Sequence, residues 1–110
     1  MNLTKELLIL LSSSKMTYDE YITKGKTFLY SKKLRSINEQ ILDLMNEPNF
    51  EKNKELEEPS LDLKQHIEEW IVFWDKEQSI KNPKDNDVFI FKNYKRYPKD
   101  LELLLIKQSK

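Results

Sequence analysis

The sequence has no cysteine and a single glycine, Gly25, among its 110 residues. Without cysteine, neither a disulfide framework nor a thiolate metal site can form. One glycine excludes the glycine-rich phosphate loops of P-loop and dinucleotide-binding proteins. No apolar run approaches the roughly 18 residues that cross a bilayer, and the leucine run at residues 7–11 follows Glu6 and is too short for a secretory signal. We therefore expect a cytoplasmic protein that has no membrane segment, metal or cofactor.

Charged side chains, at 35%, and aromatic side chains, at 11%, are what the sequence has in quantity. Because the aromatic residues are spread along the chain, a disordered polyampholyte is not expected. A chain of 110 residues is long enough for one compact core and too short for two. We expect residues 1–110 to form a single helical domain, a mainly α, compact bundle of four to five helices.

The net charge of zero conceals an uneven distribution of charge along the chain. Residues 1–38 carry seven basic and three acidic side chains, residues 39–78 carry four and twelve, and residues 79–110 carry eight and four. Two interpretations are open. Oppositely charged helices can be neighbours that partly neutralise each other, or the middle segment can form an acidic surface that meets a basic partner.

Residues 61–78 form the helix around which we expect the fold to be organised. Ser60, after Pro59, is a favourable N-cap, and Pro83 predicts that the helix ends near Asn82. Apolar residues spaced by three and four define the expected inward face, which consists of Leu63, Ile67, Trp70, Ile71 and Trp74.

Two helices are predicted before residue 31. Leucine spacing predicts a helix over residues 2–11, and the serines of residues 12–15 favour a break because they compete for backbone hydrogen bonds. Thr17 and Glu20 then form a capping box for a helix over residues 18–30. The expected inward residues of this second helix are Tyr18, Tyr21, Ile22, Phe28 and Leu29.

Gly25 falls inside that second predicted helix, and a close helix crossing is the expected reason. A further capping box at residues 36–39 predicts a third helix that ends near Asn46. The two capping boxes favour a break at residues 31–35. Leu34, however, is in phase with the next apolar stripe, so a continuous helix remains open.

The remaining segments combine loops with one more helix. Residues 47–58 are expected to form a polar, acidic loop, and residues 80–87 a turn-rich one. Residues 88–91 form an apolar, β-prone run that we interpret as a short extended segment. Pro98 can occupy the first turn of a last helix. The apolar residues of that helix point to nearly all of its sides, so either the rest of the protein covers it completely or it belongs to an interface. These residues are Leu101, Leu103, Leu104, Leu105 and Ile106.

The side chains that could support catalysis lack the partners they need. His66, the only histidine, has no cysteine nucleophile and no serine in a recognisable elbow. Asp62 and His66, four residues apart, make at most half of a metal site. Trp70 and Trp74 are typical of a core, although tryptophan is also enriched at binding hot spots. We therefore do not expect an enzyme.

Acidic residues line both edges of the aromatic face of residues 61–78 and form the candidate binding site. Leu61 and Val72 lie on the back of the same helix, where a simple surface helix would be polar. Apolar surface among acidic side chains is what a docking surface for a basic protein would present. The predicted contact residues are Glu57, Glu58, Asp62, Glu68, Glu69 and Asp75, with Asp85 and Asp87 from the following loop.

Residues 3–30 combine a leucine-rich first helix, a short Ser/Lys break, a second helix capped by Thr17 and an aromatic residue, Tyr21. This pattern resembles the opening of small bacteriocin immunity proteins of the colicin D immunity type. Related small proteins protect bacteria against their own contact-dependent growth-inhibition toxins. The resemblance implies a helical, cytoplasmic bacterial protein that binds a nuclease toxin domain and covers its basic, RNA-binding active site with acidic residues. Here the acidic middle segment would take that part.

Two other classes of function compete with this one. Residues 92–97 and Lys32, Lys33 and Arg35 combine basic side chains with tyrosines, as in a nucleic-acid-binding or regulatory protein. The neutral net charge does not favour that class. The apolar last helix could instead belong to a non-catalytic assembly subunit.

Overall fold

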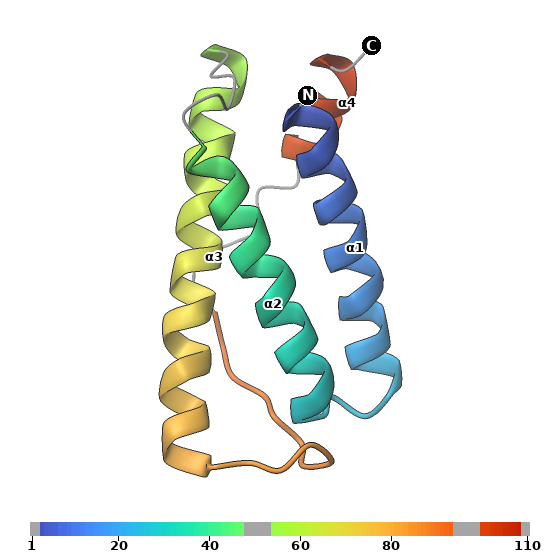
Figure 1. Cartoon of the computed structure of the whole chain (residues 1–110), viewed down its shortest axis with the longest axis vertical. Helices are drawn as coiled ribbons and strands as arrows, with labels where there is room; N and C mark the ends of the chain where they lie inside the picture. The colour runs from blue at the N-terminus through green and yellow to red at the C-terminus, as the bar shows by residue number, and fades with distance from the viewer. Residues whose placement is uncertain (1–2, 48–53, 94–99, 109–110) are drawn as a thin grey trace.

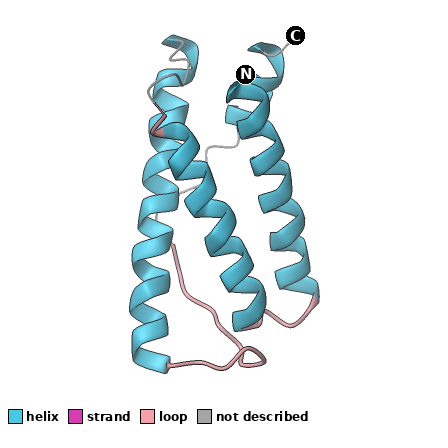
Figure 2. Ribbon diagram, in the orientation of Figure 1, coloured by secondary structure: helices cyan, strands magenta, loops and turns pink. Residues whose placement is uncertain are grey.

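A computed structural model describes residues 3–47, 54–93 and 100–108 of the chain and contains four helices in these ranges. They are α1 (Leu3–Thr23), α2 (Phe28–Met45), α3 (Lys54–Lys81) and α4 (Asp100–Gln108). α2 lies between α1 and α3, and the short α4 lies near the N-terminal end of α1 (Figure 1). No strand occurs in the described part of the chain (Figure 2). The predicted class, a mainly α bundle of four to five helices, is confirmed.

The predicted break at residues 12–15 is wrong, because α1 continues through the serines. A serine costs a helix about 0.5 kcal/mol relative to alanine, whereas burying a leucine contributes about 1.5–3 kcal/mol. Leu7 and Leu11 are 0% and 2% exposed. Continuing the helix keeps these leucines and Ser14 on one face, so tertiary packing outweighs the local preference of serine.

α1 ends at Thr23, just before Gly25, and the close helix crossing predicted at this glycine is also wrong. Gly25 has a φ of +91° and Lys26 one of +55°, and the Lys26 amide donates to the Tyr21 carbonyl at 2.7 Å. This pattern is a Schellman motif, in which glycine readily adopts the left-handed backbone. A Cβ added at Gly25 would meet its nearest atom, on Thr27, only at 4.0 Å. Backbone conformation, and not lack of space, explains the glycine.

α2 runs without interruption through residues 31–35, where the two capping boxes favoured a break, so that prediction is wrong. Leu34 is in phase with the buried face, as the continuous alternative required, and the capping box at residues 36–39 lies inside the helix. Leu34, Asn38 and Ile41 are all buried on one side. The helix ends at Met45 with Asn46 as its C-cap, as predicted.

α3 confirms the predicted inward face and the predicted end, but it begins earlier than expected. Leu63, Ile67 and Trp74 are buried, and the helix ends before Asn82, which has a φ of +44°. Pro59 lies inside the helix. A proline removes one amide donor from the helix, and the turn that precedes it still stays helical. The predicted loop at residues 47–58 is therefore helical from residue 54 onward, and residues 48–53 lie outside the described part.

The chain after α3 returns to the beginning of α2. The amides of Phe28 and Leu29, in the first turn of α2, donate to the carbonyls of Asp87 and Asp85 at 2.8 and 3.0 Å. Thr27, the N-cap residue, makes no side-chain cap hydrogen bond. Carbonyls from a distant loop therefore satisfy amides that a capping side chain would usually bind.

Residues 88–91 are extended, as predicted, but pair only briefly. Val88 forms an isolated antiparallel bridge with Thr27. The Tyr21 hydroxyl donates to the Phe89 carbonyl. These bonds attach the extended segment to the turn between α1 and α2.

The core divides into two clusters at opposite ends of the bundle. The aliphatic cluster takes side chains from all four helices: Leu7, Leu11, Ile41, Leu63, Ile67, Leu101 and Leu105. The aromatic cluster takes side chains from α2, from α3 and from residues 82–93, which we call the returning segment. Its members are Phe28, Trp74 and Phe89, with the partly buried Trp70 and Phe91 packed against them.

The shortness of α4, nine residues, explains why part of α1 is uncovered. Tyr18 and Ile22, predicted to face inward, are 52% and 41% exposed because α4 covers only the other end of α1. On α4 itself, Leu101 is buried, whereas Leu103 and Ile106 are 68% and 45% exposed. The side chain of Leu104, and residues 94–99 including Pro98, lie outside the described part of the chain. No described helix is long and apolar enough to cross a membrane.

Candidate functional site: the outer face of α3

The outer face of α3 carries a continuous strip of acidic, polar and apolar side chains. Each member has another member three or four residues away, which places all of them along one side of the helix. We call this the acidic strip; it consists of Glu58, Leu61, Asp62, Gln65, Glu68, Glu69 and Val72. From residue 58 to residue 72 it spans about 21 Å of helix.

Two apolar side chains interrupt the acids of the strip. Leu61 and Val72 are 54% and 64% exposed, which is high for large apolar residues on a helix whose other side forms the core. Sequence reasoning identified both as lying on the back of the helix. Apolar residues between carboxylates provide apolar area that a partner can bury, in addition to charge.

Three glutamates of the strip carry charge that the fold does not neutralise. Glu58 and Glu68 are exposed and Glu69 is partly exposed, and none of the three has an ion-pair partner in the described part of the chain. Asp62, on the same strip, is partly buried. The side chain of Glu57 lies outside the described residues.

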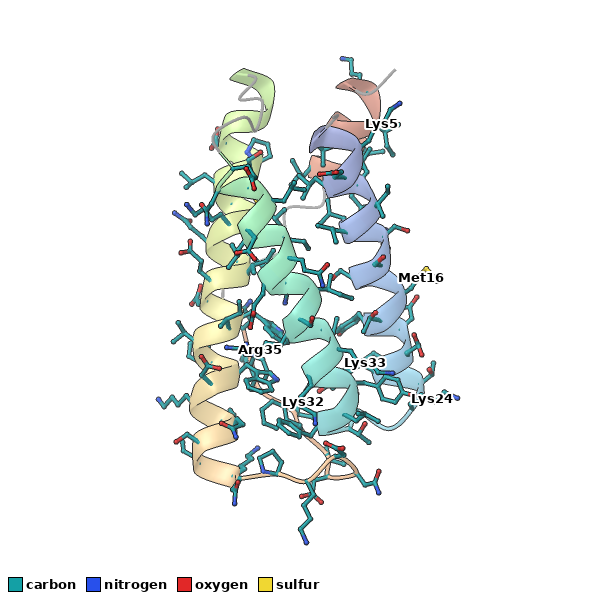
Figure 3. The ribbon with its side chains drawn as sticks, viewed as in Figure 1. Lys5, Met16, Lys24, Lys32, Lys33 and Arg35 are labelled. Atoms are coloured by element: carbon teal, nitrogen blue, oxygen red, sulfur yellow. The ribbon has the colours of Figure 1, made fainter. Side chains whose placement is uncertain are left out.

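Asp75, at the edge of the strip, is held by the neighbouring helix. Nε and Nη2 of Arg35 donate to its carboxylate at 3.1 and 3.0 Å. Arg35 also bonds Glu39, and its guanidinium lies 4.9 Å from the ring centroid of Trp74. Figure 3 shows Arg35 reaching from α2 toward α3. Asp75 thus joins two helices and is less available to a partner than the glutamates.

Asp85 and Asp87 also have structural partners and do not lie on the strip. The Asp85 carboxylate pairs with the Lys32 ammonium, and the Asp87 carboxylate accepts from the Lys84 amide at 2.8 Å. Their carbonyls cap α2. The interpretation that neighbouring segments neutralise each other holds at Asp75 and Asp85. The glutamates of the strip remain unpaired within the described part, so a surface that meets a basic partner stays a prediction.

Basic side chains on α2 are likewise occupied. Lys32 pairs with Asp85, Arg35 pairs with Asp75, and the Lys33 ammonium lies 4.7 Å from the ring centroid of Tyr30. These three residues follow one another along α2 (Figure 3). They do not form an unpaired basic groove of the kind that tracks a nucleic-acid backbone.

His66 is part of a small polar contact and not of a metal cluster. The side-chain amide of Asn93 donates to the His66 carbonyl at 3.0 Å and lies 3.3 Å from His66 Nδ1. Among the residues that the structure describes, no group of three or more His, Asp or Glu side chains could hold a metal ion. The chemistry this face offers is charge and apolar contact.

Sequence reasoning missed Arg35 as the partner of Asp75, although the basic first third and the acidic middle third indicated that such pairs were available. It also missed Asn38, a buried amide whose position between Leu34 and Ile41 on the apolar stripe was visible in the sequence. Comparison with known proteins gives no match to a family model, to a curated protein or to a solved structure.

Proposed function

We propose that this chain is a bacterial immunity protein of the bacteriocin or contact-dependent growth-inhibition kind, and that it neutralises a cognate nuclease toxin domain acting on RNA or tRNA. In this proposal the acidic strip of α3 covers the basic active site of the toxin. The observation that carries the proposal is the combination of Glu58, Glu68 and Glu69, unpaired within the described part of the chain, with exposed Leu61 and Val72 on one helix face.

The physical argument starts from how nucleases bind their substrates. Such enzymes hold phosphates with lysine and arginine, so carboxylates fixed on a rigid helix can compete for the same cations. Complementary charge speeds the encounter of the two proteins. Burial of Leu61 and Val72 then slows dissociation, because removing apolar surface from water stabilises the complex.

Residues 3–30 add less support than the strip. The resemblance to colicin D immunity proteins places a break between two helices at residues 12–15, and α1 is continuous there. The neutral net charge of the chain is also a departure from the strongly acidic character expected of such inhibitors. The proposal therefore depends on the placement of charge on α3.

The test first establishes whether a nuclease domain is encoded beside the gene, then mixes that domain with the full chain and measures RNA cleavage and the dissociation constant. Reversing the charge of Glu68 and Glu69 together, with Glu68→Lys and Glu69→Lys, should weaken binding by about tenfold or more, mainly through slower association. Asp19 and Glu20 on α1 are both exposed and provide a matched pair of adjacent acids.

The control variant, Asp19→Lys with Glu20→Lys, makes the same change in net charge away from the strip and should bind within about twofold of wild type. Both variants should unfold within about 0.5 kcal/mol of wild type, as is usual for surface substitutions. Equal affinity of the two double variants would remove the strip from the interface. Absence of any binding to the neighbouring nuclease domain would overturn the proposal itself.

A second candidate function, a non-catalytic assembly subunit, is favoured by α4. Leu103 is 68% exposed there, beside Ile106 at 45%. An apolar helix face of this kind can bury itself in a further copy or another subunit. A mass that rises with concentration in wild type, and stays that of one chain in Leu103→Glu, would support this alternative.

A further inference from the structure

A pocket lies beside α2, between α1 and α3, whose backbones do not approach each other closely. α4 bridges α1 and α3 at one end of the bundle, and the returning segment through Phe91 and Asn93 lies toward the other (Figure 1). Between them remains a space of about 450 Å³ lined by side chains of all four helices and of this segment. Ligand pockets occupy about 300–1,000 Å³, so the space is large enough for a small molecule.

The walls of this pocket are mainly apolar, with rings at one end. Leu34, Ile41 and Ile67 belong to the aliphatic part, and Trp70 and Phe91 present aromatic side chains to the pocket. The two rings lie 5.2 Å apart between centroids and are inclined by 58°. Apolar and aromatic walls of this kind favour a flat, uncharged molecule.

Asn38 is the most deeply buried polar residue among those that line the pocket. It is 8% exposed. No hydrogen bond joins its carboxamide to another group within residues 3–47, 54–93 and 100–108. No fully buried side-chain nitrogen or oxygen in these ranges lacks a partner, so the carboxamide atoms of Asn38 keep contact with the open space of the pocket.

Comparison with Ser31 shows that the fold does pair its other buried polar side chain. The Ser31 hydroxyl donates to the Phe28 carbonyl at 2.7 Å and accepts from Trp74 Nε1 at 3.1 Å. At the pocket wall, Asn93 bonds His66. Asn38 differs from Ser31 and Asn93 because its amide faces the pocket and has no hydrogen-bond partner in the described part of the chain. Solvent can satisfy such an amide, and so can the complementary edge of a ligand.

We propose that this pocket binds an uncharged, flat heterocycle with a hydrogen-bond donor and acceptor side by side, of the nucleobase or nucleoside class. A carboxamide presents an acceptor oxygen and a donor nitrogen next to each other, and it can bind an adjacent donor and acceptor on a base in a bidentate manner. Trp70 and Phe91 supply the aromatic surface on which the rings of such a ligand pack.

The charge at the edge of the pocket restricts the ligand further. Lys15 and Glu102 both line the pocket and pair with each other at 3.1 Å. With this lysine neutralised by a carboxylate, the described lining leaves no unpaired cation for a phosphate group. A free base or nucleoside fits this site better than a nucleotide. The inference does not depend on the toxin-binding proposal, because the pocket and the acidic strip lie on different faces of α3.

The experiment titrates the ¹⁵N-labelled full chain with adenine, cytosine and adenosine and follows the side-chain amide resonances of Asn38. N6,N6-dimethyladenosine is compared with adenosine, because it lacks the N6 donor and its ribose removes the N9 donor beside N3. We expect saturable shifts of the Asn38 resonances with at least one of the three ligands. If adenosine binds, the dimethylated nucleoside should bind at least about tenfold more weakly, because one good bidentate pair contributes about 1–3 kcal/mol.

Asn38→Leu should reduce the affinity by roughly tenfold or more, and its cooperative thermal unfolding checks that the variant is folded. Gln40→Leu, on the exposed side of the same helix, should change neither affinity nor Asn38 resonances. Equal binding of a ligand to wild type and Asn38→Leu would overturn the assignment of Asn38. Saturable binding of adenosine and its dimethyl derivative with equal affinity, or unchanged Asn38 resonances with all three ligands, would overturn the proposal directly on the wild-type protein.

Discussion

The two ends of the bundle are stabilised in different ways. The aliphatic cluster contains seven buried side chains drawn from all four helices, and each lies on a helix face that its own spacing defines. The aromatic cluster has three buried rings from α2, α3 and a segment outside any helix. One end therefore follows from helical periodicity, whereas the other depends on a stretch of chain that returns after α3.

Phe89 is the residue through which the returning segment enters the aromatic cluster. Its ring is fully buried and lies 5.0 Å from Phe28, 5.6 Å from Trp74 and 5.8 Å from Phe91, measured between centroids. Edge-to-face and offset ring pairs at such separations add to the stability gained from burial. The aromatic end should therefore be more sensitive to a single substitution than the aliphatic end.

The largest expected effect is that of Phe89→Ala. Removing this ring should lower the free energy of unfolding by about 3–5 kcal/mol, through lost burial and the cavity it leaves. Urea denaturation monitored by tryptophan fluorescence measures this loss, because Trp74 reports on the same cluster. Val88, its neighbour, is 61% exposed, so Val88→Ala should change stability by no more than about 0.5 kcal/mol. Similar losses for both variants would mean that the segment does not contribute through the Phe89 ring.

The comparison is sharpened by Leu63→Ala in the aliphatic cluster, which should cost about 2–5 kcal/mol. Native-state hydrogen exchange then distinguishes the two ends, since regions open separately when their contacts differ. Relative to the overall loss of stability in each variant, Phe89→Ala should speed hydrogen exchange of the Phe28 and Leu29 amides more than Leu63→Ala does. Identical exchange patterns in the two variants would show that the core unfolds as one unit.

An intermediate effect is expected at Gly25, in the turn that joins α1 to α2. Gly25→Ala places a Cβ on a residue with a φ of +91° and should destabilise the protein by about 1–2 kcal/mol. Ser12→Ala, on the exposed face of the continuous α1, should instead stabilise it by up to about 0.5 kcal/mol. The two thermal shifts should have opposite signs. A destabilising Ser12→Ala would argue for a break in α1.

The smallest effect concerns the link between the returning segment and α1. Burial, with a smaller contribution from the nearby Tyr18, raises the pKa of Tyr21 above its ordinary value of 10.0. A raised pKa means that the folded state favours the protonated phenol. This contribution to stability is complete below pH 10 and is lost as the pH rises through the folded-state pKa.

Tyr21→Phe removes the hydroxyl that donates to the Phe89 carbonyl and should cost about 0.5–1.5 kcal/mol at neutral pH. The melting temperatures of wild type and variant should converge as the pH rises above 10, because only wild type then loses a protonated donor. A difference that stays constant from pH 7 to the alkaline limit of folding would contradict the role given to the phenol.

Much of the helical architecture was predictable from the sequence, and the misplaced breaks came from local signals. The inward face of α3 and its end near Asn82 followed from spacing and from Pro83. The capping boxes that begin at Thr17 and Ser36 misled because they are worth only about 1 kcal/mol each. Leu34 and Ile41, on either side of Ser36, face the same core, and Tyr21, beyond Thr17, bonds the Phe89 carbonyl, so tertiary contacts keep both helices continuous.

The candidate site was predictable in its charge but not in its pairing. Glu58, Glu68 and Glu69 lie together on the outer face of α3, as spacing along one helix indicates. The pairing of Asp75 with Arg35 joins residues 40 positions apart, and sequence periodicity carries no information about how two helices are oriented. Asn38 was identifiable as a polar residue in an apolar stripe, but its lack of a partner depends on the three-dimensional neighbours of α2.

The carbonyls of Asp85 and Asp87 that bind the first-turn amides of α2 have a consequence for the nascent chain. When residues 1–45 have emerged from the ribosome, all of α1 and α2 is present, but the amides of Phe28 and Leu29 still lack their acceptors. These acceptors emerge only about 40 residues later, several seconds of synthesis at about 5–20 residues per second. The start of α2 should therefore remain frayed during translation, and the arrival of residues 85–89 completes the N-terminal hairpin at the same time as the aromatic cluster.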